Sequence, residues 1–147
     1  MSAVIRWVGV VLLIAPFFCF AEPPSCYAQL EREFFNPVYV NQALSMHNIS
    51  QSAWPEVNRI LKENSAVIPA RTRALASKQR PNPFNPPFDG EAAAKILTRV
   101  QLEVLSKTLV RFQIQNPYVV QQIYGYIKEQ QQERWNTCFG LVQLQKK

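Results

Sequence analysis

Hydrophobic residues recur at three- and four-residue spacing through the stretch 90–115. The apolar positions there are Leu97, Val100, Val104, Leu105, Leu109 and Phe112. This spacing places them on one face of an α-helix, with Lys95, Arg99 and Glu103 on the opposite, solvated face. Asp89 precedes the stretch and can cap its first turn. The pattern therefore predicts the longest helix of the chain over residues 90–115.

A second apolar stripe lies between residues 117 and 138. It is formed by Val120, Ile123, Tyr124 and Ile127 and continues to Cys138. At about 100° per residue, Cys138 has the same bearing as Val120, so the cysteine is expected to point inward. Asn116 and Pro117 separate the two stretches, and we expect 90–115 and 117–138 to form an antiparallel helical hairpin. The glutamines at 130–132 are expected to be solvated helix.

Shorter segments with helical patterns precede this hairpin. They cover residues 27–35, 38–47, 52–64 and 69–79. Four prolines between residues 80 and 88 exclude regular structure there. Glycine occurs only 4 times in 147 residues, which argues against an all-β fold. The sequence thus predicts an all-α fold, a small bundle of about five helices in a single domain over residues 22–140, with a C-terminal tail at 141–147.

The beginning of the chain has the features of an export signal. A short basic start around Arg6 leads into an apolar run that ends in the small-x-small pattern Cys19-Phe20-Ala21. This arrangement is typical of a cleaved secretory signal peptide over residues 1–21, and it predicts a periplasmic or secreted protein. A second such pattern ends at Ala28, so the cleavage site stays open. The apolar run is shorter than the ~20 residues of a spanning helix, but a retained membrane anchor stays the alternative.

Two cysteines remain after cleavage at the first site, near opposite ends of the chain. In an oxidising compartment, Cys26 and Cys138 are expected to form a disulfide bond. The bond would close a loop of more than a hundred residues, which stabilises the fold by ~4–5 kcal/mol in the chain-entropy model. A buried free thiol at Cys138 is the alternative.

Residues that carry catalysis are scarce. The chain has 1 histidine, His47, and a single aspartate, Asp89, which is already expected to cap a helix. A Ser-His-Asp triad would need both, and no motif for binding a metal or a nucleotide occurs. The sequence therefore predicts no enzyme, no catalytic residue, no metal site and no cofactor. A small secreted Glu-dependent hydrolase is kept as an alternative. Its candidate carboxylate pairs are Glu31 with Glu33 and Glu129 with Glu133.

Positive charge is concentrated between residues 59 and 80. The basic residues there are Arg59, Lys62, Arg71, Arg73, Lys78 and Arg80. The net charge after cleavage is about +5, which suits an anionic partner such as a lipid or glycan surface or an acidic protein. Nucleic acid is not expected, because aromatic residues are not interleaved with the basic ones. An ordinary solvated face is the alternative, and charge on both faces of 69–79 predicts a helix that packs lightly.

The proline-rich loop 80–88 carries Phe84 and Phe88 on a stiff extended segment. Either the two rings plug the edge of the core, or they contact a partner. Taken together, the residues predict an exported, non-enzymatic helical binding or assembly module, for example a subunit of a bacterial envelope or secretion apparatus. Its expected partner is a protein of the cell envelope, and no small-molecule substrate is identified.

Overall fold

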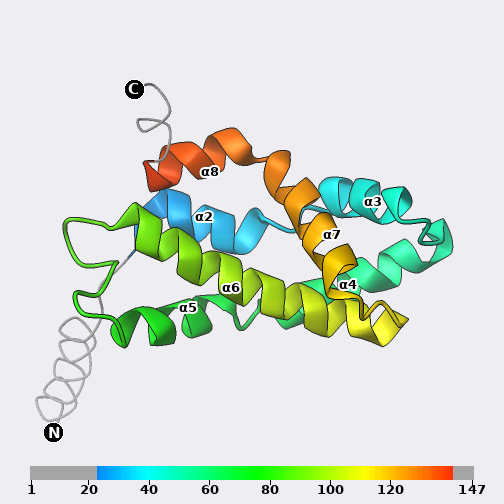
Figure 1. Cartoon of the computed structure of the whole chain (residues 1–147), viewed down its shortest axis with the longest axis horizontal. Helices are drawn as coiled ribbons and strands as arrows, with labels where there is room; N and C mark the ends of the chain where they lie inside the picture. The colour runs from blue at the N-terminus through cyan, green and yellow to red at the C-terminus, as the bar shows by residue number, and fades with distance from the viewer. Residues whose placement is uncertain (1–22, 141–147) are drawn as a thin grey trace, which may run out of the picture.

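The computed structural model describes residues 23–140, and this part of the chain is helical without any strand (Figure 1). In chain order the helices are α2 (Ser25–Glu33), α3 (Pro37–Met46), α4 (Trp54–Ser65), α5 (Ile68–Ser77), α6 (Gly90–Leu109), α7 (Pro117–Glu129) and α8 (Gln132–Phe139). Short 3-10 turns precede α4 at Gln51–Ala53 and follow α6 at Val110–Phe112. The all-α prediction is confirmed.

Three helices begin at side-chain caps, and the cap at Asp89 confirms a prediction from the sequence. The side-chain oxygen of Asn36 accepts a hydrogen bond from the backbone N–H of Val38 at 2.9 Å, at the start of α3. Asp89 caps α6 in the same way, with its Oδ1 3.1 Å from the third backbone nitrogen of the helix. Asn116 caps α7, and a proline occupies the first position after it. These caps satisfy backbone donors that a helix start leaves unpaired.

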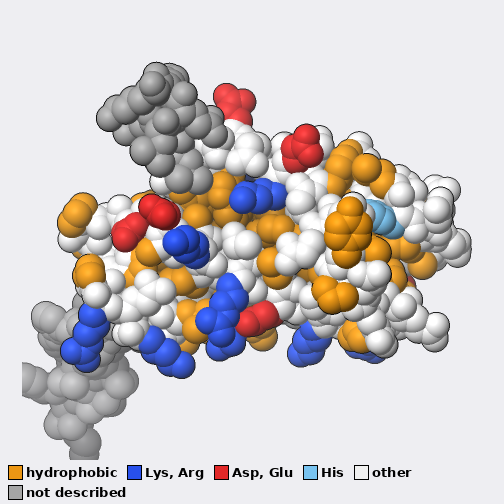
Figure 2. All heavy atoms as spheres, in the orientation of Figure 1, with side chains coloured by type: hydrophobic (Ala, Val, Ile, Leu, Met, Phe, Trp, Pro, Cys, Tyr) orange, Lys and Arg blue, Asp and Glu red, His pale blue; other side chains and the backbone are white. Residues whose placement is uncertain are grey.

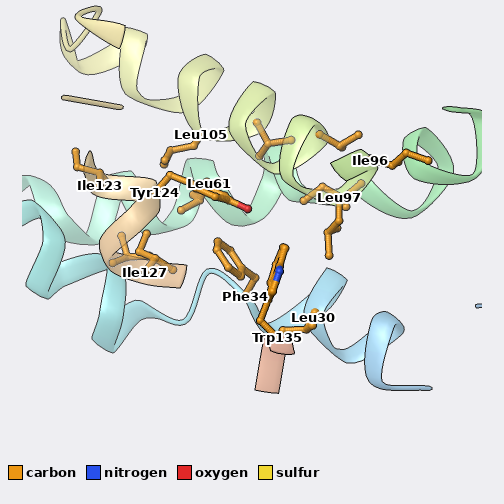
Figure 3. Packing of buried hydrophobic residues seen from close by; sticks show 14 of the residues in the cluster. Leu30, Phe34, Leu61, Ile96, Leu97, Leu105, Ile123, Tyr124, Ile127 and Trp135 are labelled. Atoms are coloured by element: carbon orange, nitrogen blue, oxygen red, sulfur yellow. The ribbon is translucent and has the colours of Figure 1, made fainter. Parts of the chain in front are cut away.

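Helix α6 is the central element of the molecule. It packs against α4 and α5 on one side and against α7 and α8 on the other, while α2 contacts α8 and α5 (Figure 1). Its buried residues include Leu97, Val100 and Leu105, which belong to the apolar face that the spacing predicted. Figure 3 shows the rings of Phe34 and Trp135 side by side in the core, and their centroids lie 5.9 Å apart. The core therefore brings α2 and α8, near the two ends of the described residues, together beside α6.

The prediction of a single helix over 117–138 is wrong, because the helix is interrupted between α7 and α8. Gln131 is buried, and its side-chain amide donates to the backbone carbonyl of Phe34 at 2.8 Å and to that of Ile127 at 3.2 Å. The expectation that glutamines 130–132 are all solvated is wrong for this residue. The side-chain amide donates to two backbone carbonyls in the core, and the residue type alone does not reveal that role.

Two further helix predictions need correction. α6 ends at Leu109 rather than near residue 115, since a 3-10 turn follows and Gln113 adopts a left-handed conformation with φ 63°. Helix α5 does not pack lightly. Ile68, Thr72 and Ala76 are buried at four-residue spacing and turn one side of this helix into the core against α6. The charges of α5 lie beside this narrow stripe, which is why the sequence pattern hid it.

A disulfide bond joins Cys26 in α2 to Cys138 in α8, as the sequence predicted. The bond spans 112 residues, and the two Cα atoms are 5.7 Å apart, an ordinary separation for a disulfide. The end of α8 also lies against the start of α6, because a Cβ added at Gly90 would collide with the backbone carbonyl of Phe139. The two ends of the described chain are thereby held together.

The predicted signal peptide at 1–21 and the predicted tail at 141–147 lie outside the described residues. Among helices of residues 23–140, none combines the length and the apolar character needed to cross a membrane.

Candidate functional site

A groove runs along one face of α6. Its volume is about 930 Å³, and we call it the α6 groove. Helix α6 contributes a stripe that runs from Glu91 to Ser106, and α7 and α8 supply the opposite wall. The lining residues are Glu91, Ala94, Lys95, Thr98, Arg99, Leu102, Glu103, Ser106, Pro117, Val120, Gln121, Lys128 and Trp135. Figure 2 shows apolar side chains in the region between α6, α7 and α8.

The α6 groove is apolar at its bottom and charged at its rim. Ala94 and Leu102 are half-buried, and Val120 from α7 is buried beside them. On the rim, the carboxylate of Glu91 lies 3.7 Å from the ammonium of Lys95. Glu103 lies 3.4 Å from Arg99 and at the same distance from Arg71 of α5. Both rim carboxylates are therefore already engaged in exposed ion pairs.

Lys128 differs from the other cations of the groove. Its ammonium nitrogen lies 4.7 Å from the ring centroid of Trp135, over a buried indole. No carboxylate of residues 23–140 forms an ion pair with it. Lys128 is half-buried, and this loss of solvation lowers the pKa of its ammonium. The groove thus contains a partly desolvated cation on an aromatic base.

A second pocket of about 670 Å³ lies between the end of α2 and helix α4. Two of the predicted contact residues, Arg59 and Lys62, line it together with Arg32. Arg59 is engaged by Glu56 and Glu63 on its own helix. The pocket is more polar than the α6 groove and brings only part of the predicted basic stretch together.

Glu31 is a buried carboxylate at the edge of this second pocket. The hydroxyl of Thr72 donates to its Oε2 at 2.6 Å, and the guanidinium of Arg73 lies 3.5 Å from its Oε1. Burial raises the pKa of Glu31, and these two partners act in the opposite direction. Burial also raises the pKa of Tyr27, one turn earlier on α2. The cluster ties α2 to α5 in the core.

In each of the two candidate carboxylate pairs for hydrolysis, the two glutamates lie in different surroundings. The side chain of Glu31 is 2% exposed, whereas that of Glu33 is 55% exposed. The carboxylate of Glu33 lies 3.8 Å from the guanidinium of Arg134. Glu129 ends α7, and Glu133 lies in α8 beyond the break. In the described part of the chain, no group of three His, Cys, Asp or Glu residues could hold a metal ion. The absence of an enzymatic activity stays a prediction.

The predicted basic residues do not form one surface. Arg71 pairs with Glu103, and Arg73 is committed to Glu31. Lys78 and Arg80 are exposed at and beyond the end of α5, at a distance along the chain from the cations of α4. Contact of these residues with an anionic partner stays a prediction.

A wider segregation of charge escaped the sequence argument. Residues 68–112, which form α5, the proline loop, α6 and its 3-10 turn, carry eight Lys and Arg against three Asp and Glu. Figure 2 shows Lys and Arg side chains following one another along the lower edge of the view, below α5 and α6. Lys107 and Arg111 of this segment are exposed, and the basic stretch drawn from the sequence stopped short of them. The segment is the most basic part of the described surface.

Phe84 and Phe88 of the proline-rich loop pack at the edge of the core. Phe84 is buried, and its ring centroid is 4.9 Å from that of Tyr27. Phe88 is half-buried and lies 6.3 Å from the ring of Phe139. The rings therefore occupy the positions that the core-edge interpretation predicted, and the partner interpretation lacks an exposed pair of rings.

Comparison with known proteins gives no relative. No protein-family model, no curated protein and no solved structure matches the chain. The site and its function are therefore argued from the geometry of this molecule.

The sequence reasoning missed the α6 groove. It assigned Lys95, Arg99 and Glu103 to a solvated face, where they are indeed exposed. However, Ala94 and Leu102 lie among them, eight residues apart on the same side of the helix. This second, weaker apolar line was the signal that could have indicated a groove.

Proposed function

We propose that the protein is an exported, non-enzymatic binding or assembly module, and that it serves as a subunit of a bacterial envelope or secretion apparatus. Its partner is a protein of the cell envelope. The observation that carries the proposal is the α6 groove, an apolar-bottomed surface with a mixed charged rim. Surfaces of this kind are typical of sites where another chain packs.

Export is supported by two independent features. The leader at residues 1–21 has the composition of a signal peptide, and the disulfide between Cys26 and Cys138 suits an oxidising compartment such as the periplasm. Cleavage after Ala21 is favoured over cleavage after Ala28. The later site would remove Cys26 together with Tyr27, a fully buried core residue.

The groove is formed by helices whose relative placement is fixed. α6 supplies one wall, and we propose that its antiparallel pairing with the helix after Asn116 is the frame of the site. α8 supplies Trp135, and the disulfide at Cys138 holds this short helix to α2. A preorganised groove loses little entropy when a partner binds, which favours a docking function.

A bulky side chain in the groove tests the proposal. In Ala94→Trp the indole would fill the bottom of the groove, whereas Ala70→Trp places the same side chain on an exposed position of α5 outside both pockets. In gel filtration of a detergent extract from the native host, we expect wild type and Ala70→Trp to elute in a larger complex. Ala94→Trp should elute as a free domain with an unchanged thermal midpoint. Elution of wild type as a free monomer would contradict the proposal.

Two alternatives are distinguished by other measurements. A retained anchor would leave the N-terminal 21 residues on the exported chain, which the intact mass reveals. For a Glu-dependent hydrolase, Glu31 is the candidate whose burial raises its pKa in the direction useful for a general acid. Its side chain is only 2% exposed and bonded to Thr72 and Arg73, which leaves little access for a substrate.

A further inference from the structure

We infer that the α6 groove binds an acidic amphipathic helical segment of a protein partner. Apolar side chains of this segment cover Ala94, Leu102 and Val120, and one of its carboxylates pairs with the ammonium of Lys128. This inference rests on the proposed function and names the chemistry of the partner.

The shape of the groove favours a helical segment. The stripe from Glu91 to Ser106 covers fifteen residue steps of α6, or about 22 Å at 1.5 Å per residue. Its apolar bottom is a narrow line flanked by polar and charged side chains. A helix that presents residues at i, i+3, i+4 and i+7 offers an apolar stripe of the same form, and this is a common mode of peptide recognition.

The charges that line the groove favour a partner segment with negative charge. Three cations line it, Lys95, Arg99 and Lys128, against the carboxylates of Glu91 and Glu103. Both carboxylates are already paired, while Lys128 has only the indole of Trp135 within the described structure. Covering the groove would desolvate this ammonium further, at a cost that a carboxylate of the partner offsets.

The same rim argues for a protein rather than a membrane. Glu91 and Glu103 both line the groove and would face the phosphates of an anionic lipid surface. Lipid-binding faces instead surround their apolar residues with Lys and Arg. Thr98, Ser106 and Gln121 add side-chain donors and acceptors of the kind that the polar rim of a protein interface contains.

Site-specific photo-crosslinking in the native host tests the inference. The crosslinker p-benzoylphenylalanine is introduced at Gln121 or at Ser106, two exposed positions of the groove, in the full-length chain. Lys78, exposed at the end of α5, is the control position outside the groove. After irradiation, the crosslinked partner peptide is sequenced by mass spectrometry.

We expect crosslinks from Gln121 and Ser106 to a segment that carries Asp or Glu beside apolar residues at helical spacing. Lys128→Gln should reduce the yield from Gln121 roughly tenfold, since it removes one charge-assisted contact. Lys107→Gln is the matched control, because Lys107 is exposed on α6 outside the groove, and it should leave the yield unchanged.

Other results overturn the inference in distinguishable ways. A partner segment without carboxylates, a second copy of this chain, a lipid adduct, or a yield that is insensitive to Lys128→Gln would refute the acidic partner and leave the binding module in place. The absence of groove crosslinks from a chain that elutes in a larger complex would place binding elsewhere. The same absence from a chain that elutes as a monomer would end both proposals.

Discussion

Removal of the disulfide bond should destabilise the domain by about 5 kcal/mol in the chain-entropy model. The bond connects residues 112 positions apart, and the loss of loop entropy in the unfolded chain grows with the logarithm of that length. Globular domains unfold with only about 5–15 kcal/mol. Without the bridge, the domain should therefore lie near the limit of stability at 37 °C.

The assay is urea unfolding of the oxidised protein and of its Cys26→Ala/Cys138→Ala variant, followed by circular dichroism. Alanine avoids a new polar group at these half-buried positions, and the reduced wild type is the control for the substitution itself. We expect both bridge-free forms to lose about the same free energy of unfolding, with a larger urea dependence because their unfolded chains expand. A loss below about 1 kcal/mol in both forms would refute the entropy argument.

Four further substitutions test the packing and the buried charge. Gly90→Ala should destabilise the fold by roughly 1–3 kcal/mol, because the new Cβ collides with the last carbonyl of α8. Gly125→Ala in α7 should stabilise the fold by about 1 kcal/mol, because the new Cβ there meets open space. Thermal unfolding measures both effects. Gln131→Ala should cost about 1–3 kcal/mol in urea unfolding, since it leaves a buried carbonyl unpaired, and an unchanged midpoint would contradict this role. Burial raises the pKa of Glu31 above 4.5, so the protonated carboxyl contributes its full stability below pH 4.5. This contribution is lost as the pH rises through the pKa of Glu31 in the folded protein. Urea midpoints between pH 4 and pH 8 should therefore fall less for Glu31→Gln than for wild type.

The helices could be predicted where their boundary chemistry is local. Asn36, Asp89 and Asn116 cap the helices that follow them, and each is recognisable from the sequence by its position before an apolar period or a proline. The disulfide could be predicted too, because cleavage after Ala21 would leave two cysteines, which have one intramolecular pairing. These features depend on residue type and spacing alone.

The tertiary roles of polar residues could not be predicted in the same way. Gln131 is one of three successive glutamines in the sequence, yet its amide donates to the carbonyl of Phe34, directly after α2 and 97 residues away. Thr72 lies among arginines and alanines, yet it is buried against Glu31. In both cases the partner is distant in sequence, and no local pattern contains it. Periodicity therefore underestimated how much of α5 and of the α7–α8 junction is core.

The groove was missed for a related reason. Hydrophobic spacing identifies the most apolar face of α6, but it does not show which of its other faces the remaining helices cover. The break at Gln131 turns α8 away from α7, and the change of direction brings Trp135 to the base of the groove rather than leaving it on an extended helix. The break, which the sequence pattern did not predict, thus contributes Trp135 to a groove that α6 and α7 otherwise form.

The disulfide and the groove belong to one structural unit. Helix α8 has 8 residues, too few for a stable isolated helix, and it carries both Trp135 of the groove and Cys138 of the bridge within one turn. The bridge fixes the end of this helix to α2, while the start of α6 packs against its last carbonyl. Because the ring of Trp135 lies under Lys128, a displacement of α8 would remove the base of the groove and the environment of this ammonium together. We therefore expect oxidation of the two cysteines to hold the α6 groove in shape as well as to stabilise the fold, which would link the proposed docking surface to the compartment in which the bond forms.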